Sequence, residues 1–163
     1  MADTENQSLN VLSLCAGYGG IELGLDLAGL RIGRCVYVER EAYAAAVLVK
    51  AIEAGELAAG VVHTDLENFP AEKFRGCFDI IVGGYPCQPF SCAGRRGGKD
   101  DEHGRHLWPH IQRAIGFIQP RLCFFENVEG HLTLGFKDVC HDLGELGYIF
   151  TAGIFSAEEV GLP

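Results

Sequence analysis

The segment NVLSLCAGYGG, residues 10–20, joins a run of mostly apolar residues to a turn that contains three glycines. The apolar run predicts a buried strand over residues 10–15, and the stretch from the turn onward predicts a helix over residues 19–28. A strand, a glycine-rich turn and a helix open a doubly wound sheet, and the bare backbone of the turn lets a ligand approach closely. The segment therefore predicts an α/β fold with a ligand site at its first turn.

The same alternation of short apolar runs and helix-period stretches continues to the end of the chain. It predicts a mostly parallel sheet with helices on both faces. Further strands are expected over residues 34–39, 61–63, 78–82, 121–126 and 148–155, and further helices over residues 41–53, 107–117 and 135–146. Residues 93–104 carry glycines and charges without periodicity and are expected to form a mobile loop. We expect a flexible N-terminus over residues 1–10 and one domain over residues 11–163.

Composition and charge narrow the class of protein. Of the 163 residues, 48% are hydrophobic and 21% charged, which is typical of a globular domain. The first ten residues lack the pattern of a signal peptide, and no apolar run is long enough to cross a membrane. We therefore expect a cytoplasmic protein with no membrane partner and with its seven cysteines reduced. The net charge of −9 argues against strong binding to DNA by this chain alone, because phosphate contacts need Lys or Arg.

Two acidic residues stand at the ends of predicted strands. Glu39 ends the second strand, about twenty residues after the glycine turn, where a carboxylate can accept hydrogen bonds from both hydroxyls of a ribose. The alternative is a plain tight turn with an exposed Glu. Asp65 follows the third strand, where it can accept from an adenine amino group or cap the next helix. These positions favour a ligand that carries ribose and adenine.

The segment GGYPCQPFS, residues 83–91, stands where the fourth predicted strand opens into a loop. Two prolines flank Cys87, which stiffens the loop and gives the thiol a defined direction. A nucleophile needs such a direction, whereas a buried structural cysteine does not. Because open α/β sheets bind their ligands at the carboxyl ends of strands, Cys87 is predicted to be a nucleophile.

The segment FFENV, residues 124–128, ends another predicted strand with an acid, Glu126. Partial burial is expected to raise the pKa of this carboxyl, so that it can donate a proton or a hydrogen bond. The alternative is a solvated Glu at the start of a helix.

Three histidines, His103, His106 and His110, fall around one loop and helix start. No HExxH pattern accompanies them, and we expect no metal site. One of them could pair with Cys87 as in a hydrolase, but no oxyanion motif is found in the sequence.

Taken together and in this order, these segments resemble the DNA (cytosine-5)-methyltransferase family, from about residue 12 to residue 163. The PCQPFS and ENV segments are highly specific for that family. The resemblance implies a Rossmann-like S-adenosylmethionine-dependent methyltransferase fold, with the carboxylate end of the cofactor at the glycine turn, its ribose on Glu39 and its adenine near Asp65. The residues that the resemblance assigns to the cofactor are Cys15, Ala16, Gly17, Gly19, Gly20, Ile21, Glu39, Asp65, Pro86 and Leu107.

The same resemblance implies the chemistry of the site. Cys87 would attack carbon-6 of a cytosine flipped out of the DNA duplex, which prepares carbon-5 to take the methyl group. Glu126 would hold ring nitrogen 3 and the amino group of the cytosine. Residues 93–104 would form the active-site loop that closes over DNA, with an ordinary solvated loop as the alternative. The residues expected to contact the substrate are Pro86, Gln88, Ser91, Arg95, Arg96 and Asn127.

The chain departs from the family pattern in two places. Cys15 stands where the family has a Phe that packs on the adenine. Beyond Pro163 the family continues with a motif that supplies an active-site arginine, a target recognition domain and a C-terminal helix, so the fold is expected to be incomplete at its C-terminus. We therefore expect a catalytic fragment or subunit that binds DNA only with a complementing polypeptide or the rest of its own chain, in a bacterial or phage-infected cell.

Two further functions are kept as alternatives. A non-catalytic cofactor-binding or interaction module, whose exposed pocket edge is covered by self-association, would also account for the missing motifs. A nicotinamide-dependent oxidoreductase would share the glycine turn and Glu39, but it would leave the Cys87 loop without a purpose.

Overall fold

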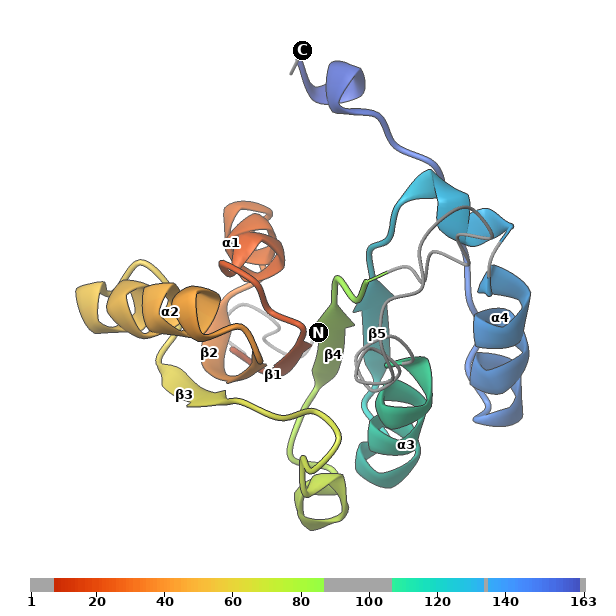
Figure 1. Ribbon diagram of the computed structural model, residues 1–163, viewed down its shortest axis with the longest axis horizontal. Coiled ribbons are helices and arrows are strands. Elements are labelled where there is room, and N and C mark those ends of the chain that lie inside the picture. Colours follow the sequence, from red (N-terminus) through yellow and green to blue (C-terminus); the bar gives the residue numbers. More distant parts are fainter. Residues whose placement is uncertain (1–7, 87–106, 134, 162–163) are drawn as a thin grey trace, which may run out of the picture.

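The computed structural model describes residues 8–86, 107–133 and 135–161. Within these residues five strands form one sheet in the order β3-β2-β1-β4-β5, and all neighbouring strands are parallel (Figure 1). The strands are β1 (Leu9–Leu14), β2 (Ile32–Val38), β3 (Gly60–His63), β4 (Ile80–Gly83) and β5 (Leu122–Phe125). The α-helices are α1 (Gly20–Leu27), α2 (Ala42–Ala54), α3 (Trp108–Ile118) and α4 (Phe136–Glu145), and the 3₁₀ helices are η1 (Ala71–Phe74), η2 (Glu129–Leu132) and η3 (Ala157–Val160).

The parallel α/β sheet predicted from the sequence is confirmed, and these five strands and four α-helices lie within two residues of their predicted ranges. The reason is that a strand buried on both faces has to be apolar throughout. Strand β4 has this character, because all of its residues from Ile80 to Gly83 are buried. Helix α2 also begins where expected, because the Glu41 side chain accepts hydrogen bonds from the backbone N–H groups of Tyr43 and Ala44.

Helices cover both faces of the sheet, as expected (Figure 1). On one face, the buried Val11, Tyr37 and Val82 of the strands pack in a cluster with Leu48 of α2, and Ile21 and Leu25 of α1 pack against this cluster. On the other face, strand residues pack in a cluster with the inner sides of α3, α4 and η1. The buried side chains of that cluster include Leu12, Ile81, Phe69, Ile111, Ile115 and Leu143.

The order of the strands creates a switch point between β1 and β4. The chain moves outward from β1 through β2 to β3 and then returns to add β4 and β5 on the other side of β1. In open sheets of this kind, the connections after the two strands at a switch point diverge to opposite faces and leave a crevice at their carboxyl ends. The carboxyl ends of β1 and β4 are therefore where a ligand is expected to bind in this fold.

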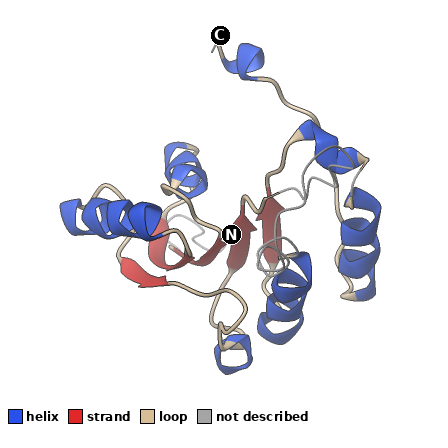
Figure 2. Cartoon of the chain, in the orientation of Figure 1, coloured by secondary structure: helices blue, strands red, loops and turns tan. Residues whose placement is uncertain are grey.

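The last predicted strand, over residues 148–155, is wrong. In the structure this stretch is a loop that leaves α4 and leads to η3, with no strand assigned to it (Figure 2). Its side chains Ile149, Phe150, Ile154 and Phe155 are exposed. Their residue types favour a strand, but a strand forms only where a neighbouring strand exchanges backbone hydrogen bonds with it.

Two other predictions concern loops and membranes. The predicted mobile loop at residues 93–104 lies outside the described residues. None of the described helices combines the length and the apolar character that a membrane span requires.

Candidate active site

The carboxyl ends of the five strands lie level with one another. Leu14 of β1 pairs with Val38 of β2 and with Gly83 of β4. The row continues to His63 of β3 and to Phe125 of β5. The residues that directly follow these strand ends are Cys15, Glu39, Thr64, Gly84 and Glu126. The sheet therefore brings two acids and two segments of the predicted site to a single edge.

The glycine turn after β1 is held by the Glu39 carboxylate. The backbone N–H of Gly17 donates to Glu39 Oε2 at 2.8 Å, and the N–H of Glu41 donates to Oε1 at 2.7 Å. Gly17 and Gly19 have φ angles of 56° and 82°, in the left-handed region that favours glycine. A Cβ added at Gly17 would meet no atom within 4 Å, so the turn faces open space. The structure thus joins Glu39 to the turn and leaves room for a ligand beside them.

Other backbone contacts complete the turn. The N–H of Ala16 donates to the carbonyl of Val38 at 3.1 Å, and the N–H of Gly19 donates to the carbonyl of Ala16 at 2.9 Å. Helix α1 begins directly afterwards at Gly20. Because each carboxylate oxygen has more than one lone pair, Glu39 keeps acceptor capacity for a ligand while it holds the turn.

Cys15, the first residue of the turn, is a neutral thiol in this setting. Burial, and to a smaller extent the charge of Glu39, raise the pKa of Cys15 to about 12. The side chain is half-buried and packs against the core. It is therefore a small apolar surface and not a nucleophile.

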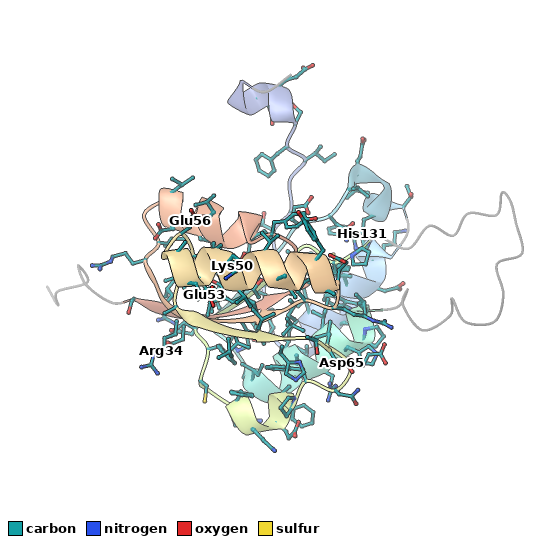
Figure 3. All side chains as sticks on the ribbon, turned by 60° about the vertical axis from the view of Figure 1, so that its left-hand side comes forward. Arg34, Lys50, Glu53, Glu56, Asp65 and His131 are labelled. Atoms are coloured by element: carbon teal, nitrogen blue, oxygen red, sulfur yellow. The ribbon has the colours of Figure 1, made fainter. Side chains whose placement is uncertain are left out.

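Asp65 lies just beyond the carboxyl end of β3 (Figure 3). Its Oδ1 accepts from the backbone N–H of Glu67 at 2.8 Å, and the Asn68 side chain donates to its Oδ2. The bond from Asn68, with smaller help from these backbone groups, lowers the pKa of Asp65. Asp65 thus accepts hydrogen bonds within the turn over residues 65–68. This role is similar to helix capping, which the sequence offered as the alternative to a contact with adenine.

Gly84 marks the point where three elements meet. A Cβ added there would lie 3.3 Å from Glu126 Oε2 and 3.8 Å from Ile21 Cδ1. The backbone N–H of Glu126 also donates to the carbonyl of Gly83 at 3.0 Å. The end of β4, the end of β5 and the start of α1 are therefore neighbours, and Gly84 lies between Glu126 and Ile21.

The Glu126 residue is exposed in the part of the chain that the structure describes, and its expected partial burial stays a prediction. It stands just past the end of β5, at the edge of the sheet where the carboxyl ends of the strands meet.

Asn127 ties the segment after β5 to the segment after β4. Its Nδ2 donates to the carbonyl of Tyr85 at 2.9 Å, and its Oδ1 accepts from the backbone N–H of Val128 at 2.9 Å. The sequence assigned Asn127 to the substrate, and the structure gives it a contact within the protein. The other two assigned residues in this region, Pro86 and Leu107, are exposed and half-buried respectively, and Leu107 precedes α3.

Several predicted site residues lie outside the described residues. They are Cys87, Gln88, Ser91, Arg95, Arg96, His103 and His106. Tyr85 and Pro86 directly precede Cys87 in the sequence, and these two residues are described.

An aromatic cluster that the sequence did not predict surrounds Tyr85. The Tyr85 hydroxyl lies 3.0 Å from His131 Nε2, and its ring packs against Trp108 and Phe125. His131 comes from η2, which was not predicted (Figure 3). The only signal in the sequence was that Tyr85 stands two residues before Cys87, and that spacing says nothing about a partner.

A family model described as C-5 cytosine-specific DNA methylase matches residues 9–163. The chain belongs to this family. Among its curated relatives, a Type II methyltransferase of Psychrobacter, M.PspPI, is 36% identical over 80% of this chain and 30% of its own length. M.BspRI of Lysinibacillus sphaericus is 31% identical over 98% of this chain and 43% of its own. This chain therefore spans less than half the length of these relatives.

Solved structures show the same fold. The Dnmt2 methyltransferase of S. pombe has a TM-score of 0.66 at 22% identity, over 94% of this chain and 45% of its own. A DNMT2 variant of Spodoptera frugiperda has a TM-score of 0.65 at 20% identity, over 87% of this chain and 42% of its own. The Rossmann-like methyltransferase fold is confirmed, and S-adenosylmethionine is the cofactor that this family and fold indicate.

Proposed function

We propose that residues 11–163 form the S-adenosylmethionine-binding and catalytic part of a DNA (cytosine-5)-methyltransferase, preceded by a flexible segment over residues 1–10. The main support is the row of strand ends, which brings the Glu39-bound glycine turn and Glu126 to one edge of the sheet. Cys87 follows the end of β4 by four positions in the sequence. The cytoplasm of a bacterial or phage-infected cell is the proposed location.

The described residues fit S-adenosylmethionine by the chemistry of their groups. Glu39 can accept both ribose hydroxyls while it holds Gly17, and the open space beside Gly17 suits the amino-acid end of the cofactor. Ile21 and Leu107 offer apolar surface, and Asp65 can still accept from an adenine amino group through a free lone pair. The remaining proposed cofactor contacts come from Cys15, Ala16, Gly19, Gly20 and Pro86.

The proposed chemistry begins at Cys87. Its thiolate forms a bond to carbon-6 of the flipped cytosine, and the electron pair of the ring's 5,6 double bond becomes available at carbon-5. A protonated Glu126 donates to ring nitrogen 3, while its other oxygen accepts from the amino group. Bound S-adenosylmethionine supplies the methyl group that carbon-5 takes. Loss of the proton from carbon-5 then expels the Cys87 sulfur and restores the aromatic ring.

DNA is the proposed substrate, and Gln88, Ser91, Arg95, Arg96 and Asn127 are its proposed contacts together with Pro86. A net charge of −9 does not favour phosphate binding, so we propose that a complementing polypeptide, or further sequence of the same protein, supplies basic groups. Exposed Ile149 and Phe155 support such a partner, since large apolar side chains left in water favour association.

A non-catalytic module that covers this apolar segment by self-association is the second candidate. The same exposed side chains support it, and intact Cys87 and Glu126 argue against it. The two candidates differ in one testable property. Both bind the cofactor, but only the enzyme forms a covalent bond to cytosine.

The test combines a measurement of cofactor binding with the trapping of a covalent adduct between Cys87 and cytosine. S-adenosylmethionine and S-adenosylhomocysteine are titrated into the chain by calorimetry. The chain is then mixed with the C-terminal half of a full-length relative and with DNA that carries 5-fluorocytosine, and the adduct is mapped by mass spectrometry. Cofactor binding with an adduct on Cys87, absent in Cys87→Ser, is the expected result. Binding without an adduct favours the module, and no binding of either compound contradicts both candidates.

A further inference from the structure

We propose that Tyr85 and His131 form an anchor that positions the chain entering Cys87. The anchor rests on the proposed function, because its purpose is to direct the thiol, and Tyr85 and His131 are positioning residues in that reaction. The observation that carries it is a hydrogen bond between a buried tyrosine, two positions before the nucleophile, and a histidine of a different element.

The Tyr85 ring is fixed by its neighbours. Only 6% of the residue is exposed, and its ring centroid lies 5.7 Å from that of Trp108 and 6.0 Å from that of Phe125. The contact with Phe125 is edge-on, with an interplanar angle of 77°. Aromatic pairs at these distances are favourable and restrict the rotation of the ring.

The Tyr85 hydroxyl requires a partner because it is carried into a mostly buried site. A hydroxyl without a hydrogen bond in such a place is costly, whereas a phenylalanine would fill the same space without that cost. His131 Nε2 provides the partner at 3.0 Å, and the two rings also meet edge-on with centroids 5.6 Å apart. The packing of the ring does not require the hydroxyl. The hydroxyl therefore adds a directional contact to His131 that a phenylalanine would lack.

The backbone of Tyr85 is held as well. Its carbonyl accepts from Asn127 Nδ2 at 2.9 Å, and the next residue is Pro86, whose ring fixes its φ angle. The residue before a proline is also restricted to extended conformations. With both ends of the Tyr85 side chain and its carbonyl held, the direction in which the chain continues toward Cys87 is largely set.

The anchor also joins the two sides of the segment that contains Cys87. Tyr85 precedes residues 87–106 and Trp108 follows them, yet the rings of Tyr85 and Trp108 pack together. Trp108 is itself fixed, since its Nε1 donates to Asp142 Oδ2 of α4 at 2.7 Å. Releasing Tyr85 is therefore expected to affect the chain on the Cys87 side more than the rest of the fold.

The experiment measures the reactivity of Cys87 in the full chain. Iodoacetamide is added at constant pH, and the alkylation rate of each cysteine is followed by peptide mass spectrometry. Cys77 is the internal reference, because it is exposed and precedes β4 at the opposite edge of the sheet. The variants are Tyr85→Phe, which keeps the ring, His131→Leu, which removes the hydrogen bond, and His131→Gln, which can restore it.

We expect the alkylation rate of Cys87 to change by at least about threefold in Tyr85→Phe and His131→Leu, because the chain that enters Cys87 is no longer held at Tyr85. In His131→Gln the rate should return to near that of the wild type, and Cys77 should be unaffected in all variants. Unchanged Cys87 rates in Tyr85→Phe and His131→Leu would overturn the proposal. So would a His131→Gln variant that behaves like His131→Leu, because the ring and not the hydrogen bond would then matter.

Calorimetry with S-adenosylmethionine on the same samples separates the two proposals. Variants that bind as the wild type does are folded, and changes in Cys87 rate then report on the anchor. If the wild type binds no S-adenosylmethionine but the Cys87 rates respond as expected, the proposed function fails and the anchor stands. If it binds and the rates do not respond, only the anchor fails.

Discussion

The glycine-turn region and the C-terminal segment of this chain differ in how well other residues of the chain pair their polar groups and cover their apolar side chains. In the glycine turn, the backbone N–H groups of Ala16, Gly17 and Gly19 all have partners, and the fully buried Leu48 packs beneath. In the segment over residues 148–156, no regular structure forms, and Ile149 and Phe155 are exposed. The turn beside which the cofactor is proposed to bind is therefore organised by contacts within the chain, whereas the C-terminal segment leaves large apolar side chains in water.

The largest expected difference between the two regions is in stability. Leu48→Ala should lower the free energy of unfolding by about 2–5 kcal/mol, because it leaves a cavity in the core beneath the turn. Ile149→Ala should change it by less than about 0.5 kcal/mol, since the side chain is already in water. Urea unfolding of both variants measures this. A large loss in Ile149→Ala would mean that the C-terminal segment is packed in solution.

The two acids of the site, Glu39 and Glu126, should differ in how much each contributes to the affinity for S-adenosylmethionine. Glu39→Ala should weaken binding of S-adenosylmethionine by about 10- to 100-fold, because it removes hydrogen bonds to a charged group. Glu126→Gln should leave the affinity within about twofold, because Glu126 is proposed to contact cytosine and not the cofactor.

Calorimetry measures both dissociation constants, and Glu53→Ala on the exposed surface of α2 is the control for loss of an acid (Figure 3). Equal losses in Glu39→Ala and Glu126→Gln would contradict the division of the site into a cofactor side and a substrate side.

Backbone strain should distinguish two adjacent glycines of the turn. Gly19→Ala should cost about 1–2 kcal/mol, because the residue has a φ of 82° and its new Cβ would lie 2.6 Å from Leu57 Cδ1. Gly20→Ala, with no atom within 4 Å and a place at the start of α1, should be neutral or stabilising. Thermal unfolding of the two variants checks the difference, and equal effects would show that the turn is not held in this conformation.

The smallest expected effect concerns Glu22, the one exception within the well-partnered region. It is 2% exposed, and neither carboxylate oxygen has a hydrogen-bond partner among the described residues. Burial raises the pKa of Glu22 above its ordinary value of 4.5. A raised pKa means that its contribution to stability is complete below pH 4.5 and is lost as the pH rises through the pKa of the folded state.

Glu22→Gln cannot ionise, so its stability relative to the wild type should increase between about pH 4 and pH 7. Urea unfolding at the two pH values measures the change, with the exposed Glu53→Gln as the matched control. A relative stability that does not vary with pH would show that Glu22 is not buried in solution.

The fold could be predicted from the sequence because its signals are local. The apolar run before Cys15, the glycines after it and Glu41 before α2 each determine structure through their immediate neighbours. Glu39 could be placed near the glycine turn because it directly follows a predicted strand, and parallel strands of one sheet bring their carboxyl ends to one edge. The strand predicted over residues 148–155 failed because strand formation depends on a partner, which residue types alone do not reveal.

The sequence by itself determined the succession of strands and helices, the glycine turn and the acids that follow β2 and β5, because periodicity and residue type act within a few residues. Only the tertiary structure decided that His131 meets Tyr85, that Glu126 is exposed and that Glu22 is buried. These facts depend on which distant segments pack side by side, and that is settled by the fit of whole surfaces and not by local pattern.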